Sequence, residues 1–338
     1  MLMRRTLANI RHGGTLAALA LVASTSLAAA EDLTVYTYSS FVSDWGPGPV
    51  AEELFEAQCG CDIAFVAVDD GVALLSRLRL EGANSPADVV LGLDLNLVAE
   101  AAADMLVVPH GLTLPPLDLP IDWDDEYFVP FDWGYFAFVY DTEMVEEPPA
   151  SLRDLVENSD VEILIQDPRT STPGLGLLLW IRQVYGEAAP AAWAQLRPRI
   201  VAVTSGWSEA YGMFLEGEAP MVLSYTTSPS YHRIAEGDER YAADAFDEGH
   251  YMQVEVAGIT QTSDAPELAA EFLAFLLSPE FQAAIPTTNW MYPARFPAGG
   301  LPEGFTPPPD GPALLYPSET VRDNRQAWID EWLTAMSR

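Results

Sequence analysis

Short apolar segments that alternate with amphipathic ones set the strongest constraint on the fold of this chain. Residues 33–38 and 62–68 are rich in β-branched and aromatic side chains, which favour strands. The segment ADVVLGLD at 87–94 is almost continuously apolar, as are strands buried in parallel sheets. Between them, residues 51–58 and 72–80 carry apolar side chains at helical spacing. Strand, helix, strand, helix, strand is the order of an α/β domain.

A long aromatic strand expected at 128–140 separates this first alternation from a second one. After it we predict a helix beginning at 151–156, a buried strand within 161–169 and a helix at 174–185. Another long strand is expected at 252–260. We interpret the two long strands as hinges that cross between two α/β lobes.

The length of 338 residues also favours two lobes, because a single hydrophobic core stops growing at about 250 to 300 residues. We predict a first lobe from 31–132 and 252–295, and a second lobe from 133–251. A C-terminal extension at 296–338 ends in an amphipathic helix that packs on the lobes.

The N-terminal segment has the order of a secretory signal peptide. Three arginines precede an apolar run at 16–27, and three alanines follow at 28–30. We therefore predict a signal peptide at 1–30 and a periplasmic location. No later segment approaches the roughly 20 apolar residues that a membrane-spanning helix needs, so we expect no membrane insertion.

The chain carries a net charge of -34, and all 16 of its basic residues are arginine. Removing the signal peptide, with its three arginines and no acid, changes -34 by -3 to -37. Nucleic acid is therefore not expected as a partner, because phosphate binding needs clustered basic residues. The acidity favours a cationic ligand, but we assign most of it to solubility.

Cys59 and Cys61 are the only cysteines. An exported protein can form a disulfide, although so small a ring strains the usual geometry. The sequence therefore leaves both a disulfide and a free pair open. Two sulfurs without a nearby histidine do not make a metal site, and we expect no metal.

Two clusters of hydroxyl side chains follow predicted strands. Residues 170–174 (TSTPG) have the composition of a helix N-terminus, whose free N–H groups bind anions. A plain helix cap explains the same residues. Residues 224–230 follow a strand at 221–223, where open α/β sheets bind ligands, although serine and threonine are also common in turns.

Aromatic and acidic residues near predicted strand ends suit a cationic heterocycle, although core packing is the better explanation for any single ring. Asp70, in the turn at 69–71, is a candidate partner for an amino group or ring nitrogen, and equally a helix N-cap. No Ser-His-Asp set is present in a pattern that indicates a triad. The rings that offer stacking and cation-π contacts are Tyr36, Tyr38, Trp45, Trp207, Tyr211, Tyr231, Trp290 and Tyr292.

Several longer motifs together resemble the thiamine-binding periplasmic proteins of ABC importers, which are bacterial extracellular solute-binding proteins. The resemblance runs from about Leu33 to Trp332 and implies a type II periplasmic binding protein fold. It also implies a monomer that uses no cofactor, is not an enzyme, and works with an inner-membrane permease and its ATPase. The motifs are VYTYSSFVSDWGPGP, DDGVALLSRLR, ADVVLGLD, VPFDWGYFAFVYD, QDPRTSTPGLGLLLW, GWSEAYG, VLSYTTSPSYH and IPTTNWMYP.

The same resemblance implies which residues bind thiamine or its mono- or diphosphate. Asp70 would pair with the aminopyrimidine, and the hydroxyl segments would hold the hydroxyethyl or phosphate end. The ligand contacts are Asp70, Gly71, Ser171, Thr172, Trp207, Tyr225, Thr226, Thr227 and Ser228, with Tyr38, Tyr231 and Trp290 as aromatic walls.

Two alternatives remain open. The same fold could bind another cationic solute, either a polyamine or a ferric ion, and metal-dependent binding would reveal iron. A secreted phosphatase could use the hydroxyl clusters, but no activating histidine or metal set accompanies them.

Overall fold

The computed structural model describes residues 32–311 and 313–337, so the predicted signal peptide lies outside the described residues. The first lobe is built on a parallel layer in the order β2, β1, β3. Its strands are β1 (Asp32–Tyr38), β2 (Asp62–Val68) and β3 (Val89–Asp94). Every residue of β3 is buried, as expected for a strand that is covered on both faces.

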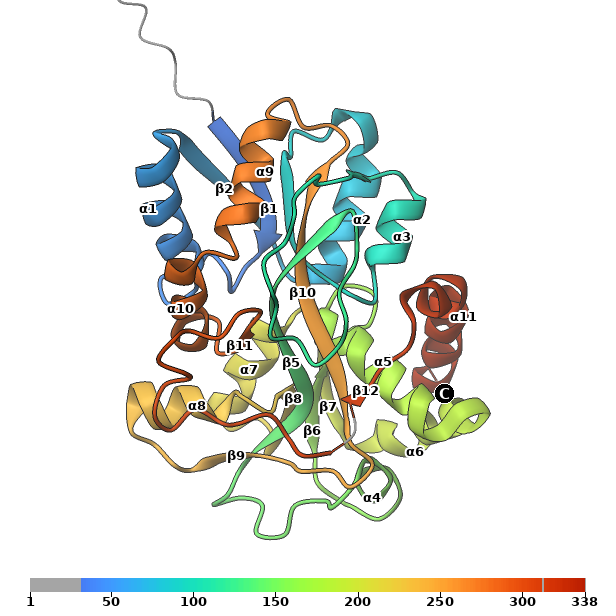
Figure 1. Ribbon diagram of the computed structural model, residues 1–338. Coiled ribbons are helices and arrows are strands. Elements are labelled where there is room, and N and C mark those ends of the chain that lie inside the picture. The colour runs from blue at the N-terminus through green and yellow to red at the C-terminus, as the bar shows by residue number, and fades with distance from the viewer. Residues whose placement is uncertain (1–31, 312, 338) are drawn as a thin grey trace, which may run out of the picture. The chain divides into compact units, whose positions relative to one another are not determined.

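Helices of the first lobe pack on this layer and lie in the upper half of Figure 1. Phe55 packs against Phe272 and Phe275, with ring centroids 5.1 and 5.3 Å apart. The structure joins Cys59 to Cys61 by a disulfide, which decides between the two states that the sequence left open. The helices are α1 (Gly48–Cys59), α2 (Gly71–Glu81), α3 (Val98–Ala103), α9 (Pro266–Phe275) and α10 (Pro279–Thr288).

The second lobe repeats the architecture around a layer in the order β8, β6, β7. Its strands are β6 (Ile163–Gln166), β7 (Ile200–Thr204), β8 (Met221–Tyr225) and β9 (Tyr241–Ala243). Its helices are α4 (Leu152–Glu157), α5 (Thr172–Tyr185), α6 (Ala189–Leu196), α7 (Trp207–Leu215) and α8 (Pro229–Tyr231), which continues as a π-helical turn at His232–Glu236.

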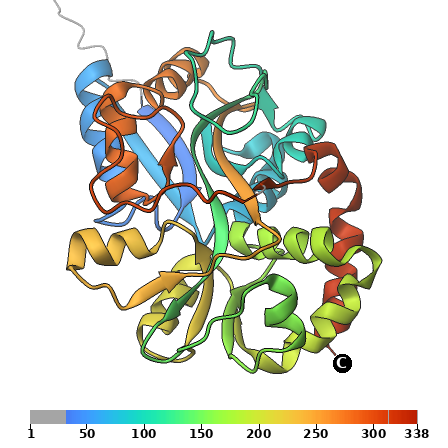
Figure 2. The ribbon, with the colours of Figure 1, turned by 60° about the horizontal axis from the view of Figure 1, so that its bottom comes forward.

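Two long strands, β5 (Phe128–Asp141) and β10 (His250–Thr260), connect the lobes. The first half of β5 pairs with β10, and its second half pairs with β8 of the second lobe. The opposite edge of β10 pairs with β3 of the first lobe. Both strands run through the middle of the molecule in Figure 2. The two predicted crossing strands are therefore confirmed, while the residue limits given above for the lobes stay a prediction.

The C-terminal helix α11 (Ser318–Met336) packs against α6 and α3, as the amphipathic pattern predicts. Arg325 of α11 donates two hydrogen bonds of 2.8 Å to Glu100 of α3. Among the described residues no single helix is long and apolar enough to cross a membrane, and α9 and α10 pass that test only as a pair bent by 66°. Short strands complete the sheets: β4 (Val107–Val108), β11 (Tyr292–Pro293) and β12 (Ala313–Leu314).

Candidate functional site

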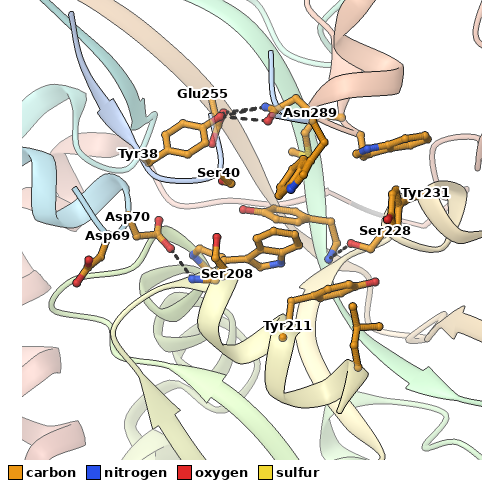
Figure 3. A pocket seen from close by; sticks show the side chains of 18 residues that line it. Tyr38, Ser40, Asp69, Asp70, Ser208, Tyr211, Ser228, Tyr231, Glu255 and Asn289 are labelled. Carbon is orange, nitrogen blue, oxygen red and sulfur yellow. Dashed lines mark hydrogen bonds between the residues drawn. The ribbon is translucent and has the colours of Figure 1, made fainter. Parts of the chain in front are cut away.

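A cavity of about 250 Å³ lies where the two lobes face each other beside the crossing strands (Figure 3). Both lobes contribute to it, together with the connection between α10 and β11. A site formed in this way changes shape whenever the lobes move about their hinges. The lining residues are Tyr38, Ser40, Trp45, Asp69, Asp70, Pro173, Trp207, Ser208, Tyr211, Gly212, Leu215, Tyr225, Ser228, Tyr231, Glu255, Asn289, Trp290 and Met291.

At one end of the cavity the N-termini of α2, α5 and α7 converge on the carboxylate of Asp70. Its Oδ1 accepts hydrogen bonds from the backbone N–H groups of Gly71 (2.7 Å) and Thr172 (3.1 Å). Its Oδ2 accepts from the Ser171 hydroxyl (2.8 Å) and from the Trp207 N–H (3.0 Å). Helix N-termini favour negative charge. The Asp70 carboxylate of the first lobe therefore occupies an anion site that is built largely by residues of the second lobe.

The four hydrogen bonds bear on the role expected for Asp70. A carboxylate has about four acceptor positions, and here four protein donors already use them. Asp70 lines the cavity, and its pairing with an aminopyrimidine, which would compete with these donors, stays a prediction. Burial raises the pKa of Asp70 above its ordinary value, although the hydrogen bonds act in the opposite direction. The N-cap interpretation of Asp70 is confirmed.

The hydroxyl segments come together around Trp207. The Trp207 indole Nε1 donates to the hydroxyl of Ser224 (2.7 Å), which lies 2.8 Å from the hydroxyl of Ser228. Of the predicted hydroxyl contacts, Tyr225 and Ser228 line the cavity. The other predicted contacts of the two lobes are buried and do not belong to the lining: Gly71, Ser171, Thr172, Thr226 and Thr227.

Thr172 and Thr226 carry buried hydroxyl oxygens that have no hydrogen-bond partner among the described residues. The Thr172 hydroxyl lies beside the Cα of Gly71, where an added Cβ would come within 2.3 Å of it. Only glycine therefore permits this approach of α2 to α5. The predicted residues Gly71 and Thr172 thus lie against each other where the two helix ends meet.

Aromatic rings form two groups at the cavity. Trp207 stacks on Tyr211 at 4.8 Å and meets the half-exposed Trp45 edge-on at 6.3 Å. Tyr231 and Trp290 meet edge-on at 5.4 Å. Trp290 has a φ of 55°, a conformation that costs free energy in a residue with a side chain and that clusters at functional sites. The predicted aromatic residues Tyr38, Trp207, Tyr231 and Trp290 therefore all reach this cavity.

The floor of the cavity contains acidic and amide side chains that the sequence analysis did not single out. Glu255 of β10 accepts a hydrogen bond from the Tyr38 hydroxyl at 2.7 Å. Asn289 donates to Asp132 of β5 at 2.5 Å and to the Tyr38 oxygen at 3.1 Å. Figure 3 shows Tyr38, Glu255 and Asn289 grouped on one side of the cavity. Their sequence signal is an acid inside each of two largely apolar crossing strands, Asp132 in β5 and Glu255 in β10.

No group of three or more histidine, cysteine, aspartate or glutamate side chains in the described part of the chain has the arrangement of a metal site.

The sequence and structure both resemble known proteins over most of their length. Residues 43–283 match the family described as bacterial extracellular solute-binding protein. A thiamine-binding periplasmic protein of Salmonella typhimurium is 55% identical over 308 residues, which covers 90% of this chain and 94% of that protein. A thiamine-binding periplasmic protein of Brucella abortus is 52% identical over 313 residues, which covers 92% of this chain and 93% of that protein.

A solved structure titled periplasmic thiamin binding protein has a TM-score of 0.88 to this chain. The two share 54% sequence identity, and the match covers 91% of this chain and 97% of that one. The likeness confirms the predicted fold class of two α/β lobes joined by crossing strands.

Proposed function

The chain belongs to the bacterial extracellular solute-binding protein family, and we propose that it captures thiamine or a thiamine phosphate between its lobes for delivery to an ABC importer. Its relatives at 52–55% identity carry the name thiamine-binding periplasmic protein. The type II periplasmic binding protein fold suits this task, because lobe closure around a solute creates a form that a permease can distinguish from the empty protein.

The cavity supports this proposal most directly, because aromatic rings form its walls and an acidic side chain lies at its floor. Thiamine has two aromatic rings, one of which carries a permanent positive charge. Trp207, Tyr231 and Trp290 offer ring faces and edges at the cavity, and each good cation-π contact contributes about 0.5–2 kcal/mol. Glu255 supplies an acidic group within the same lining.

The hydroxyethyl or phosphate end of the ligand would lie toward Tyr225, Ser228 and the N-terminus of α7. Asp70 already accepts the four hydrogen bonds of the neighbouring anion site. A phosphate that used those donors would have to displace the Asp70 carboxylate. The relative affinities of thiamine, its monophosphate and its diphosphate therefore report whether the Asp70 side chain moves.

The N-terminal 30 residues would act as a signal peptide, and the mature protein would work as a periplasmic monomer. It would use no cofactor, bind no metal and catalyse no reaction. Its macromolecular partner would be the inner-membrane permease, whose ATPase supplies the energy.

Calorimetric titration tests the ligand assignment directly. The protein is unfolded to remove any bound ligand, refolded, and titrated with thiamine, thiamine monophosphate and thiamine diphosphate. We expect submicromolar binding of at least one of them. Refolded protein that binds none of the three would contradict the assignment, and tighter binding of spermidine or ferric ion would replace it with one of the alternatives.

A further inference from the structure

Three acidic residues lie in register on neighbouring strands beneath the cavity. Glu255 of β10 pairs with Asp94 of β3 on one side and with Asp132 of β5 on the other. The side chains of Asp94 and Asp132 are fully buried, and that of Glu255 is 7% exposed at the cavity floor. Burying a charge without a partner is costly, so this arrangement needs a physical explanation.

Two of these acids, Asp132 and Glu255, accept hydrogen bonds from uncharged side chains only. Their hydrogen bonds come from Tyr38, Asn289 and Gln253. Within residues 32–311 and 313–337, no arginine or histidine forms an ion pair with either carboxyl group. The chain also contains no lysine. No basic side chain of the described structure therefore neutralises the pair.

One atom of the pair indicates where a proton lies. Asp132 Oδ1 is buried and accepts no hydrogen bond from any N–H or hydroxyl group of the described residues. The nearby carboxyl group of Glu255 can donate to Asp132 only when it carries a proton, and such a hydrogen bond acts to lower the pKa of Asp132. A proton held between the two groups would therefore satisfy the buried oxygen.

The surroundings favour that protonated form. Burial raises the pKa of Asp132 to about 7. Burial is also the larger cause, and the nearby charge of Asp132 the smaller one, that raises the pKa of Glu255 well above its ordinary value. Two close carboxylates resist simultaneous ionisation. The ionisable groups that face Glu255 from the packed elements are Tyr38 of β1, Asp70 at α2, Asp94 of β3, Asp132 of β5 and Tyr225 of β8, and all of them are acids.

We propose that Asp132 and Glu255 share a proton in the empty protein and release it when a cationic ring enters the cavity, so that the ionised pair is the ligand's counter-charge. This inference rests on the proposed function. The positive charge of the ligand takes the place of the proton, which passes to the solvent. The pair then discriminates a cationic ring from an uncharged ring of the same shape.

Proton release can be measured on the unaltered protein. Thiamine is titrated at pH 6, 7 and 8 in buffers with different ionisation enthalpies, so that the buffer heat counts the protons released. We expect release approaching one proton at pH 6 to 7, and affinity that rises by up to tenfold per pH unit in that range. The control ligand is the uncharged analogue in which carbon replaces the quaternary ring nitrogen, and it should release no proton.

Two variants assign the proton to the pair. Glu255→Gln should lower affinity for thiamine at least tenfold at pH 8, leave affinity for the uncharged analogue within about twofold, and flatten the pH dependence. Asp132→Asn gives a second test if Glu255→Gln does not fold. Glu267→Gln, at an exposed position of α9, is the matched control and should behave as wild type.

The outcomes separate this inference from the proposed function. Wild-type protein that binds thiamine with no proton release and no pH dependence overturns the shared proton but leaves thiamine binding intact. A Glu255→Gln variant that keeps wild-type proton release and pH dependence also overturns it. Failure of the wild-type protein to bind thiamine overturns the proposed function, and the inference with it.

Discussion

The carboxylate of Asp70 links the two lobes through several hydrogen bonds. It belongs to the first lobe, whereas three of its four donors are in Ser171, Thr172 and Trp207 of the second. Hydrogen bonds to a charged group contribute about 1.5–3 kcal/mol each when both partners are buried. The same contact can form only when the lobes are close, so it stabilises closure around a ligand.

Replacing Asp70 with asparagine should therefore weaken ligand binding. The amide nitrogen of asparagine would face at least one backbone N–H group, so at least one of the four hydrogen bonds would be lost together with the negative charge. We expect Asp70→Asn to reduce the affinity for thiamine by roughly 10- to 100-fold, since about 1.4 kcal/mol corresponds to tenfold. Calorimetric titration at pH 7.5 measures the effect.

The neighbouring residue provides the control for this change. Asp69 also lines the cavity, but its side chain is exposed. Asp69→Asn removes the same formal charge from the same turn and should change the affinity less than threefold. Equal losses of affinity in the two variants would show that net charge determines binding. They would also show that the hydrogen bonds of Asp70 at the helix ends do not.

The sequence predicts single residues well where their role is local. The N-cap interpretation of Asp70 has a local signal, a polar residue immediately before a helical pattern. Glu255 was not recognised, because its importance depends on Asp132 and Tyr38, which are distant in sequence and meet only in the folded sheet. Residue type and spacing do not report such long-range contacts.

At the scale of elements, α5 packs directly on the crossing strand β5 at a glycine. A Cβ added to Gly176 would lie 2.0 to 2.6 Å from ring atoms of Phe136, which is fully buried. The ring cannot move away freely, because Tyr225 packs against it with centroids 5.2 Å apart. The absence of a side chain at Gly176 therefore sets how closely the helix approaches the hinge strand.

Gly176→Ala should consequently destabilise the protein despite the higher helix propensity of alanine. Overpacking a core costs about 1–3 kcal/mol, and we expect a loss in that range in the free energy of unfolding by urea. Gly212→Ala in α7 is the matched control, because a Cβ there meets no atom within 4 Å. It should be neutral or stabilise by up to about 1 kcal/mol. Similar effects at both positions would contradict the packing argument.

The sequence predicts elements most reliably where burial is extreme. The strands expected at 62–68 and 128–140 occur at Asp62–Val68 and Phe128–Asp141. No separate element was expected for β7 or α10. In β7 the side chains are partly exposed, and α10 contains Pro286 within the helix, so neither has a clear periodic pattern. Tertiary packing determines such elements.

For the whole molecule, buried acids make stability depend on pH. Burial raises the pKa of Asp94 and of Asp132 to about 7, and it raises that of Asp244 well above its ordinary value. Between the ordinary pKa near 4 and the raised value, the folded protein binds more protons than the unfolded chain. Stability therefore falls as pH rises through this range. His250, whose pKa is lowered by burial, acts in the opposite direction.

We therefore expect the ligand-free protein to unfold at a lower temperature at pH 8 than at pH 5.5. The difference should be about 2 °C or more, the change that roughly 1 kcal/mol produces in a large domain. Differential scanning calorimetry across this range measures it. Asp94→Asn should reduce the slope, whereas Glu52→Gln, at an exposed position of α1, should not. A melting temperature that rises steadily toward pH 8 would contradict the raised pKa values.

The net charge of -34 affects how a cation reaches the cavity. A strongly negative protein raises the local concentration of cations and the rate at which they associate. Salt shortens the range of this field, from about 10 Å at 0.1 M to about 3 Å at 1 M. The association rate of thiamine should therefore fall with salt, on the order of tenfold between 0.05 and 1 M NaCl.

Stopped-flow fluorescence can follow this association, because Trp207 and Trp290 line the cavity. The uncharged analogue should associate at nearly the same rate at all salt concentrations. Glu255→Gln removes only one acid out of 50, so it should keep most of the salt dependence of thiamine association while losing affinity through faster dissociation. If the variant instead lost the salt dependence, the attraction would come from the cavity floor alone, and the surface acidity would have no part in capturing the ligand.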